Sequence, residues 1–462
     1  MARALRAGFP FRRIAVVLSG GGALAAYEVG ALKALEAAGL RPHVVSGASA
    51  GALNAVAWVG HDFHTAPLER VWRTVTPGAI GIRWTTVAWR AAGAFLVAFG
   101  ILEMLLTWTG SPELGTAAVL WRAQAERAGF PSAVLDLAAW AAVAIAGALV
   151  LRSSRGAERW LARLGSPDAG RRLRTGIGGL LLVWALVHVV TWTLAIPWPH
   201  RFSATLLIAA FAVWITNEPG RLGAWARGAL IRLLPEAQGR GLWGEAARRN
   251  LVSRLIARGD PDRLVAGHPH LIVVALALDT GRVAHFVNGA DPSAGFRASV
   301  EARLGEVITL RTPSEVLGAA VASSAVPVIF EPVTVNGREF VDAVAFATHP
   351  LRAAVDAGAD AAIVVRVAPG GATPWALPRR RPLDTWARFL DLAGWRDLQQ
   401  EIHSLPDSWR KGREPRPLCI VEPEAPLPWG VLSYSPRVSR ELIRRGEVDA
   451  WRALERAGWL GP

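Results

Sequence analysis

The chain has 462 residues, of which 52% are apolar and 19% are charged, and its mean hydropathy is +0.28. This composition excludes a disordered chain, and the single cysteine excludes a disulfide framework. A formal charge of +14 favours an anionic partner, either phospholipid headgroups or nucleic acid. The 21 tryptophans, a residue type that concentrates where membrane meets water, favour a membrane bilayer as partner and no nucleic acid.

Strands alternate with helices at the start of the chain. An apolar run at residues 14–18 predicts a buried strand, residues 23–38 a helix and residues 43–45 a second strand, and a further helix begins at Ala50. The first run is too short for the core of a signal peptide, so we expect the N-terminal segment to be retained.

The same alternation resumes after about residue 240. The expected strands are residues 271–278, 283–287, 340–342, 361–367 and 418–421, and the expected helices are residues 313–324, 351–356, 383–398 and 436–457. Continuous apolar strands that alternate with helices predict the α/β class, with a mainly parallel sheet covered on both faces.

Four long apolar runs separate these two parts, at residues 91–109, 132–151, 176–198 and 202–216. Three of them reach the ~20 residues that a bilayer core requires, and tryptophans flank them, so we predict a four-helix transmembrane insertion. The loop at residues 152–174 holds seven arginines against two acidic residues. By the positive-inside rule this loop and both chain termini are cytoplasmic, which predicts an integral membrane protein with four spans.

Three titratable residues lie inside the apolar runs, namely Glu103, Asp136 and His188. They are consistent with an ion or lipid-headgroup site, but we favour groups that pair helices or reach toward the interface.

A serine pentapeptide, Gly47-Ala48-Ser49-Ala50-Gly51, follows an expected strand and opens an expected helix. Small residues around the serine allow a sharp turn that projects its hydroxyl at the positive end of the helix dipole. The pattern is typical of a nucleophile elbow and predicts that Ser49 is a nucleophile.

A glycine run, Gly20 to Gly22 followed by Ala23, joins the first expected strand to the first helix. Successive glycines let backbone N–H groups point together at one anion, as an oxyanion hole requires. A dinucleotide-binding fold would need an acidic residue at the end of the second strand, where this chain has Ser46. No recognisable metal-ligand spacing occurs, so we predict neither a cofactor nor a metal.

Together these motifs resemble the patatin-like phospholipase family. The family opens with a strand, G-G-G-x-[RK]-G, a helix, a second strand and G-x-S-x-G, and residues 17–51 are similar to this opening. The family's later A-S-x-A-x-P and D-G-[GA] motifs are similar to residues 322–327 and 340–343. The resemblance implies a three-layer α/β/α sandwich that uses a Ser-Asp dyad and no catalytic histidine.

The resemblance also implies a role for each matching residue. Ser49 would be the nucleophile, and Asp342 would be the base, made more basic by partial burial. The amides of Gly20, Gly21, Gly22 and Ala23 would form the oxyanion hole, while Gly47 and Gly51 would shape the elbow.

Two positions depart from the family pattern, since Leu24 stands where a basic residue is usual and Ala343 where glycine is usual. Neither change removes a group that makes or breaks bonds. A Ser-His-Asp triad that uses His285 or His349 is an alternative, although neither histidine lies in a recognisable triad context.

We therefore expect a patatin-like catalytic domain in two parts, residues 1–88 and 218–370, interrupted by a transmembrane insertion at residues 89–217. Residues 371–462, rich in Pro, Trp and Arg, would pack on the domain or the membrane surface. The predicted function is a membrane-embedded serine hydrolase of phospholipids or other lipid carboxylic esters, with a cytoplasmic catalytic domain. The alternative is a catalytically inactive scaffold or lipid-binding protein of the membrane. The lipid, the acyl position and the oligomeric state are left open.

Overall fold

The computed structural model describes residues 5, 9–82, 84–108, 137–138, 140–151, 225, 243–289, 291–344, 346–370, 382–406, 409 and 417–461. The chain divides into two compact units: unit 1 comprises Met1–Ile82 and Arg240–Pro462, and unit 2 comprises Arg83–Gly239.

The strands are β1 (Ile14–Leu18), β2 (Val44–Ala48), β3 (His270–Ala277), β4 (Val283–Asn288), β5 (Gly305–Leu310), β6 (Val333–Val335), β7 (Arg338–Val341), β8 (Ala361–Val365) and β9 (Leu418–Val421). The α-helices are α1 (Ala26–Ala37), α2 (Ala50–Gly60), α3 (Ala66–Trp72), α4 (Trp84–Trp108), α10 (Ala246–Ile256), α11 (Ala294–Glu301), α12 (Pro313–Ser323), α13 (Leu351–Asp356), α14 (Pro382–His403) and α16 (Pro436–Arg456). Three 3-10 helices are η1 (Gly22–Ala25), η2 (Pro77–Ile80) and η4 (Pro261–Leu264).

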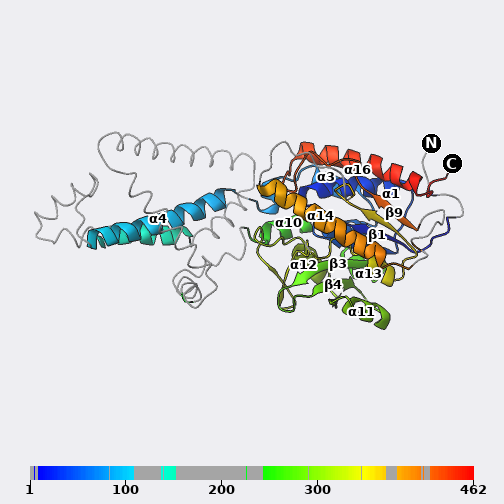
Figure 1. Ribbon diagram of the computed structural model, residues 1–462, viewed down its shortest axis with the longest axis horizontal. Helices are drawn as coiled ribbons and strands as arrows, with labels where there is room; N and C mark the ends of the chain where they lie inside the picture. The colour runs from blue at the N-terminus through cyan, green and yellow to red at the C-terminus, as the bar shows by residue number, and fades with distance from the viewer. Residues whose placement is uncertain are drawn as a thin grey trace, which may run out of the picture. The chain divides into compact units, whose positions relative to one another are not determined.

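The described strands form one sheet with the order β5-β4-β3-β2-β1-β8-β9 (Figure 1). Strands β3, β2, β1, β8 and β9 are parallel, whereas β4 and β7 run antiparallel to β3. Every residue of β1 and β2 is buried, because helices cover both faces of the sheet. The predicted α/β class with a mainly parallel sheet is confirmed.

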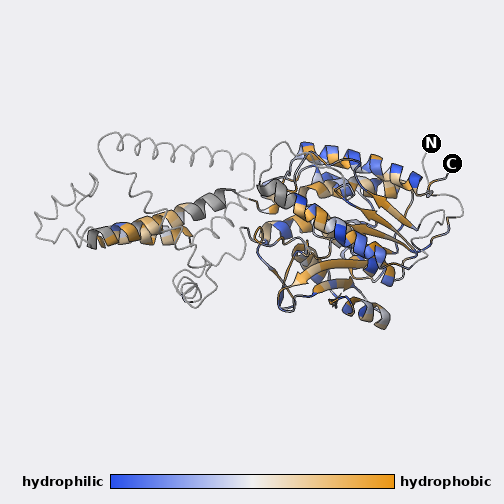
Figure 2. Ribbon diagram, in the orientation of Figure 1, coloured by the Kyte–Doolittle hydropathy of each residue, from blue (hydrophilic) through white to orange (hydrophobic). Residues whose placement is uncertain are grey.

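Helices α11, α13 and α14 cover one face of the sheet, where Phe296, Leu351 and Leu398 join Val17 and Ile272 in one hydrophobic core. On the other face α2 packs on β2, α12 on β3, and α16 on α1 and β9. Figure 2 shows the strands hydrophobic along their length and α16 divided into a hydrophilic and a hydrophobic side. Unit 1 is therefore the predicted three-layer α/β/α sandwich.

The last part of the chain belongs to the same sandwich. Strand β9 extends the sheet beside β8, and α16 lies along α1, where the Tyr27 hydroxyl donates a hydrogen bond of 2.9 Å to Asp449. The segment between β9 and α16 thereby reaches the glycine run, since Val431 accepts a backbone hydrogen bond of 2.8 Å from Ala23.

The prediction of an integral membrane protein with four spans and cytoplasmic termini is wrong. In the part of the chain that the structure describes, no helix has both the length and the apolar character needed to cross a bilayer. The predicted runs at residues 176–198 and 202–216 and the arginine-rich loop at residues 152–174 lie outside the described residues, as do Asp136 and His188.

Part of the first predicted run packs against another helix within unit 2, although Ile101 and Leu105 of the run are exposed. A side chain at Gly100 would place its Cβ 2.7 Å from the backbone nitrogen of Ala144, so α4 and the helical residues 140–151 pack with their backbones close together. Glu103 on α4 is only 1% exposed. An apolar run indicates that a segment avoids water, but it does not indicate what covers the segment. Here a neighbouring helix covers part of α4.

Candidate active site

A strained turn between β2 and α2 carries Ser49. The residue has φ 53° and ψ −128°, in the left-handed half of the backbone map that side chains rarely adopt, and it is the N-cap of α2. A Cβ at Gly51 would lie 2.4 Å from the Ser19 carbonyl oxygen, and one at Gly47 would lie 2.7 Å from the Gly51 oxygen. The two glycines therefore permit the close approach on which this turn depends, and the hydroxyl sits at the positive end of the α2 dipole.

Ser323, the last residue of α12, ties this turn to the sheet. The Ser49 backbone N–H donates to the Ser323 hydroxyl over 2.8 Å, and that hydroxyl donates to the Val274 carbonyl on β3 over 2.6 Å. Ser323 is fully buried. Ser323 lies in the motif at residues 322–327, but nothing local in the sequence indicates which backbone groups its hydroxyl bridges.

Asp342 follows β7 directly and reaches the same edge of the sheet. Val341 pairs with Leu276 near the end of β3, while Ala48, the residue before Ser49, pairs with Val274 on the same strand. The Asp342 backbone N–H also donates to the Ala325 carbonyl over 2.9 Å. The structure thus brings together the two residues that the sequence predicted as a dyad, across 293 positions of the chain.

The Asp342 carboxyl is only 2% exposed, and burial raises its pKa to about 7. The Ser49 hydroxyl, the Val344 amide and the Arg248 guanidinium each act to lower that pKa. Ser49 and Val344 lower it as hydrogen-bond donors and Arg248 lowers it through its charge, although among the described residues neither carboxyl oxygen has a partner of strict hydrogen-bond geometry. A carboxyl with a pKa near neutrality can accept a proton from a serine hydroxyl far better than an exposed one.

The amides predicted to form an oxyanion hole differ in their availability. The Ala23 N–H donates to the Val431 carbonyl, so in this structure it is not available to bind an oxyanion. The amides of Gly20 and Gly21 make no backbone hydrogen bond within the described residues. Gly21 lines both cavities beside Ser49, so the free amides lie at the correct end of the sheet to meet an anion there.

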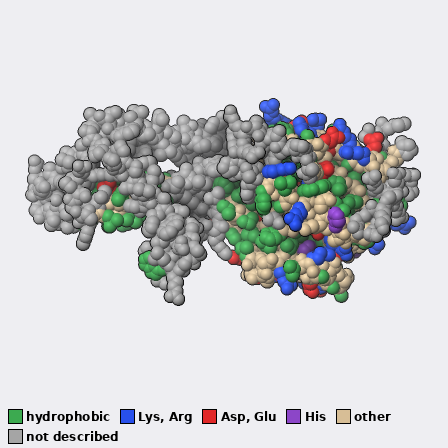
Figure 3. All heavy atoms as spheres, in the orientation of Figure 1, with side chains coloured by type: hydrophobic (Ala, Val, Ile, Leu, Met, Phe, Trp, Pro, Cys, Tyr) green, Lys and Arg blue, Asp and Glu red, His purple; other side chains and the backbone are tan. Residues whose placement is uncertain are grey.

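Two cavities meet at Ser49, each with a volume of about 90 Å³. The first, which we call the apolar pocket, is walled mainly by Leu53, Ile80, Leu251, Val326, Ile329 and Phe330. The second, which we call the polar pocket because Asp342 lies in its wall, is lined by polar residues together with a larger apolar surface, namely Ser19, Asp342, Thr348, His349, Arg366 and Asp391 with Leu24, Val344, Val367, Ala368, Leu390 and Val431. Of the large exposed apolar residues, Leu432 lines the apolar pocket itself, and Val328, Phe346 and Phe389 lie within two positions of pocket-lining residues. Figure 3 shows hydrophobic side chains gathered on the face where α10, α12 and α14 lie in Figure 1.

Arg248 on α10 is a buried cation in the wall of the apolar pocket. Its side chain is held by hydrogen bonds to the carbonyls of Val321 and Glu331 and to the Ser324 hydroxyl, and it lies 4.2 Å from the centre of the Phe330 ring. Burial lowers the pKa of its guanidinium to about 10, so the residue stays charged near neutral pH. No local pattern indicates a role for this position, because α10 follows a long interruption of the domain.

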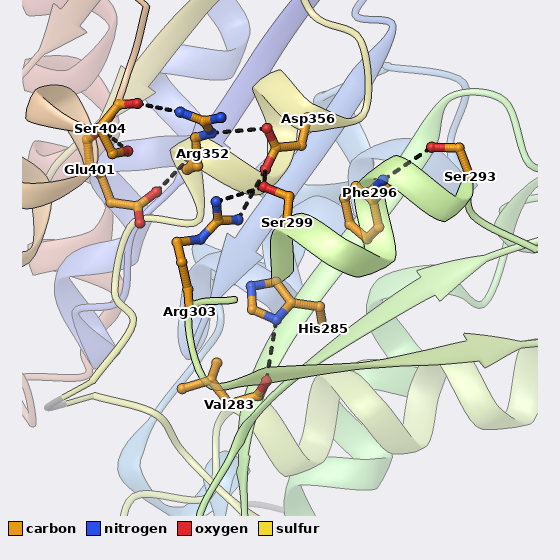
Figure 4. A network of polar contacts seen from close by, with 10 residues as sticks. All are labelled: Val283, His285, Ser293, Phe296, Ser299, Arg303, Arg352, Asp356, Glu401 and Ser404. Atoms are coloured by element: carbon orange, nitrogen blue, oxygen red, sulfur yellow. Dashed lines mark hydrogen bonds and ion pairs between the residues drawn. The ribbon is translucent and has the colours of Figure 1, made fainter. Parts of the chain in front are cut away.

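His285, one of the two candidate triad members, lies away from both pockets. Its Nδ1 contacts the Val283 carbonyl at 3.2 Å, and burial lowers its pKa to about 4 (Figure 4). Nearby, Asp356 on α13 accepts hydrogen bonds from Ser299, Arg303 and Arg352, a network that links α11 to α13. The polar groups near His285 hold α11 against α13, and none of them lines either pocket at Ser49.

His349, by contrast, lines the polar pocket. Its Nδ1 lies 2.8 Å from the Thr348 hydroxyl and 3.4 Å from an Asp397 oxygen, and its backbone N–H donates to the same oxygen over 3.0 Å. Burial lowers the pKa of the imidazole, so it is neutral near pH 7. Its place in the pocket was missed because Asp397 lies on α14, which no spacing rule connects to His349. Within the described ranges, no group of three or more potential metal ligands could hold an ion.

Residues 16–355 match the family described as "Patatin: Patatin-like phospholipase". The chain belongs to the patatin-like phospholipase family. Among solved structures it is similar to the crystal structure of VipD from Legionella pneumophila, with 13% identity and a TM-score of 0.35 over 99% of this chain and 70% of that one. No curated protein sequence matches the chain.

The two departures from the family motifs both lie at this site. Leu24 lines the polar pocket, and Ala343 follows Asp342 with a buried side chain. Membership of the family supports a lipid acyl hydrolase in general.

Proposed function

We propose that the protein is a serine hydrolase of lipid carboxylic esters in which Ser49 and Asp342 act as a dyad. The observation that carries the proposal is the serine of a strained elbow beside a buried carboxyl whose pKa is about 7. Ionising a carboxyl whose pKa is raised by burial destabilises the fold, and such a group in a pocket beside a nucleophile is typical of a catalytic base.

In the first step Ser49 Oγ attacks the ester carbonyl while Asp342 takes the hydroxyl proton. The carbonyl oxygen becomes an oxyanion, which the amides of Gly20, Gly21 and Gly22 stabilise together with the positive end of α2. Collapse of this intermediate breaks the bond to the alcohol, which leaves with the proton from Asp342. Water, activated by the same carboxylate, then hydrolyses the acyl-enzyme and regenerates Ser49.

The apolar pocket supports a fatty acyl chain as the acyl part of the substrate. Its walls are aliphatic and aromatic, and the exposed apolar residues near its lining residues extend that character toward solvent. Burial of apolar surface on this scale supplies affinity in proportion to the chain length that enters the pocket.

The experiment that tests the proposal uses an active-site fluorophosphonate and two substrates, a short-chain ester and a phospholipid. Ser49→Ala should abolish labelling and turnover, and Asp342→Asn should lower turnover by orders of magnitude. The two losses should not add in the double variant, since both residues serve one step. His285→Gln is the matched control and should retain activity.

Near-normal turnover by a well-folded Asp342→Asn protein would overturn the dyad. If the parent protein cleaves no ester and Ser49 resists the fluorophosphonate, a lipid-binding protein without turnover is the better description. The Ala23 amide engaged by Val431 is the observation that favours this second candidate.

A further inference from the structure

The glycine run at residues 20–22 and the elbow at Ser49 come from different segments, yet the proposed reaction needs them at a fixed separation. An oxyanion hole acts only when its amides point at the oxygen that becomes charged after Ser49 attacks. The two segments touch, because a Cβ at Gly20 would lie 2.7 Å from the Ser49 Cβ. At the upstream end of the run, the Ser19 N–H donates to the Val365 carbonyl of β8 over 3.1 Å, which fixes that end to the sheet.

Asn54 on α2 holds the downstream end. The run continues into η1, whose last residue is Ala25, and Asn54 Nδ2 donates to the Ala25 carbonyl over 3.0 Å. The same nitrogen donates to Glu28 Oε2 on α1 over 2.8 Å, and Asn54 Oδ1 accepts from Trp72 Nε1 on α3 over 2.7 Å. Asn54 is fully buried and lies on the helix that begins directly after Ser49. One side-chain amide therefore joins the elbow helix to η1, α1 and α3.

The neighbours of Asn54 determine the orientation of its amide. An indole N–H can only donate and a backbone carbonyl can only accept, so Oδ1 faces Trp72 and Nδ2 faces Ala25. Both hydrogens on Nδ2 then have an acceptor. Aspartate has the same shape but lacks these two donors, and leucine lacks all three groups, so neither side chain can make the same contacts.

Glu28 acts in this network as an uncharged acceptor. Its side chain is fully buried, and burial raises the pKa of its carboxyl well above the ordinary value, although the hydrogen bond from Asn54 acts in the opposite direction. Its Oε1 has no hydrogen-bond partner among the described residues. Buried polar groups are costly when they lose their partners, so these contacts strongly favour one position of the Asn54 amide.

We propose that Asn54 is a positioning residue, whose amide holds the segment of the oxyanion amides at a fixed separation from Ser49. Trp72 and Glu28 in turn hold the amide in place. None of these three residues lines either pocket at Ser49, so they act through the backbone of η1 and α2 and not by contact with the substrate. The inference rests on the proposed function, since the separation matters only if Ser49 is acylated.

The first test compares kcat with KM for a short-chain ester. In Asn54→Ala, kcat should fall by roughly 10- to 100-fold while KM changes by less than about twofold, because the oxyanion forms only after attack and a misplaced hole does not weaken binding of the ester. Equal losses in kcat and in the affinity for the ester would indicate a general disturbance of the site and would overturn the proposal.

The second test measures the oxyanion hole without turnover. Ser49 Oγ adds to the carbonyl carbon of an alkyl trifluoromethyl ketone, its proton passes to Asp342, and the carbonyl oxygen becomes an oxyanion like that of the intermediate. This ketone should inhibit Asn54→Ala about tenfold more weakly than the parent, whereas the matching methyl ketone, which forms no stable adduct, should bind both proteins equally. Equal inhibition of the two proteins by the trifluoromethyl ketone would contradict the role of Asn54.

Asn288→Ala is the matched control, because it also removes a buried asparagine that bridges two elements. Asn288 on β4 accepts from the Leu271 N–H over 2.7 Å and donates to the Pro269 carbonyl over 3.1 Å. Leu271 pairs with Val45 near the start of β2, whereas Ser49 follows the end of that strand. The control should lose stability but retain the kcat of the parent in its folded state, and a matching fall in kcat would show that loss of any buried asparagine suffices.

Two variants of Glu28 keep the proposal falsifiable if Asn54→Ala does not fold. Glu28→Gln retains an acceptor for Asn54, whereas Glu28→Met has a similar length and no strong acceptor. Glu28→Gln should therefore have a kcat several-fold above that of Glu28→Met, at similar KM. Equal kcat values in these two folded proteins would overturn the proposal.

The ketones also separate this inference from the proposed function. If the parent cleaves no ester and binds the trifluoromethyl ketone no more tightly than the methyl ketone, the hydrolase assignment fails and the role of Asn54 fails with it. If the parent does both and Asn54→Ala behaves as the parent does, only the role of Asn54 fails.

Discussion

Replacing Asp342 by asparagine should stabilise the fold above neutral pH even though it disables the proposed dyad. The folded carboxyl has a pKa of about 7, against 3.8 for the free group. Between these values the unfolded chain has lost a proton that the folded chain retains, so the ionisable group costs stability as pH rises through this window. A difference of about 3 pKa units corresponds to about 4 kcal/mol by pH 8, because each unit is worth about 1.4 kcal/mol.

The measurement is denaturant unfolding of the parent and Asp342→Asn proteins at several pH values from about 4 to about 8. Other groups titrate equally in both proteins, so the difference in the free energy of unfolding isolates Asp342. That difference should be small near pH 4 and grow to about 4 kcal/mol in favour of the variant by pH 8. Asp291→Asn, a change at an exposed carboxylate, should show no such growth. A difference that stays constant with pH, or a variant that becomes less stable as pH rises, would refute a buried carboxyl of raised pKa.

Turnover should depend on ionised Asp342, so kcat/KM for a short-chain ester should rise about tenfold from pH 6 to pH 8 with a midpoint near the pKa of about 7; a flat profile would exclude this base. Gly51→Ala would place a Cβ 2.4 Å from the Ser19 oxygen, so unfolding free energy should fall by about 1–3 kcal/mol and activity should drop with it, whereas full activity would show that the turn tolerates displacement. Burial lowers the pKa of His285 to about 4, so below pH 6.5 the unfolded chain binds a proton that the folded chain does not. As pH falls from 6.5 to 4, the free energy of unfolding of the parent should therefore decrease by about 3 kcal/mol relative to that of His285→Gln. Unfolding free energies that change equally with pH in the two proteins would contradict this.

Features set by a few neighbouring residues were predictable from the sequence. The first strand was expected at residues 14–18 and is β1 (Ile14–Leu18). The helix expected from residue 313 is α12, which begins with a capping box between Thr312 and Glu315 and has Pro313 in its first turn. The sharp turn at Ser49 was also predictable from the sequence, because the two glycines that permit it lie two positions before and two positions after the serine.

The membrane prediction failed for a reason that is physical. A long apolar run indicates that burying the segment away from water is favourable. Either a neighbouring helix or a lipid bilayer can bury it, so the run alone does not distinguish the two. Close packing of α4 on residues 140–151, with Gly100 at the contact, is a property of two segments together and has no signature in either alone.

The sequence by itself predicted the central strands and most of the helices that follow them, the position of the elbow, and the motifs that place the chain among the patatin-like phospholipases, whereas β5, β6, α3, α10 and α11 were not predicted. Only the tertiary structure decided which side chains meet at Ser49. Asp342 arrives there because β7 pairs with the end of β3, Ser323 because α12 packs on that strand, and Arg366 because β8 lies beside β1. Contacts of this kind join residues hundreds of positions apart, and they are selected by the packing of whole layers, which no local pattern encodes.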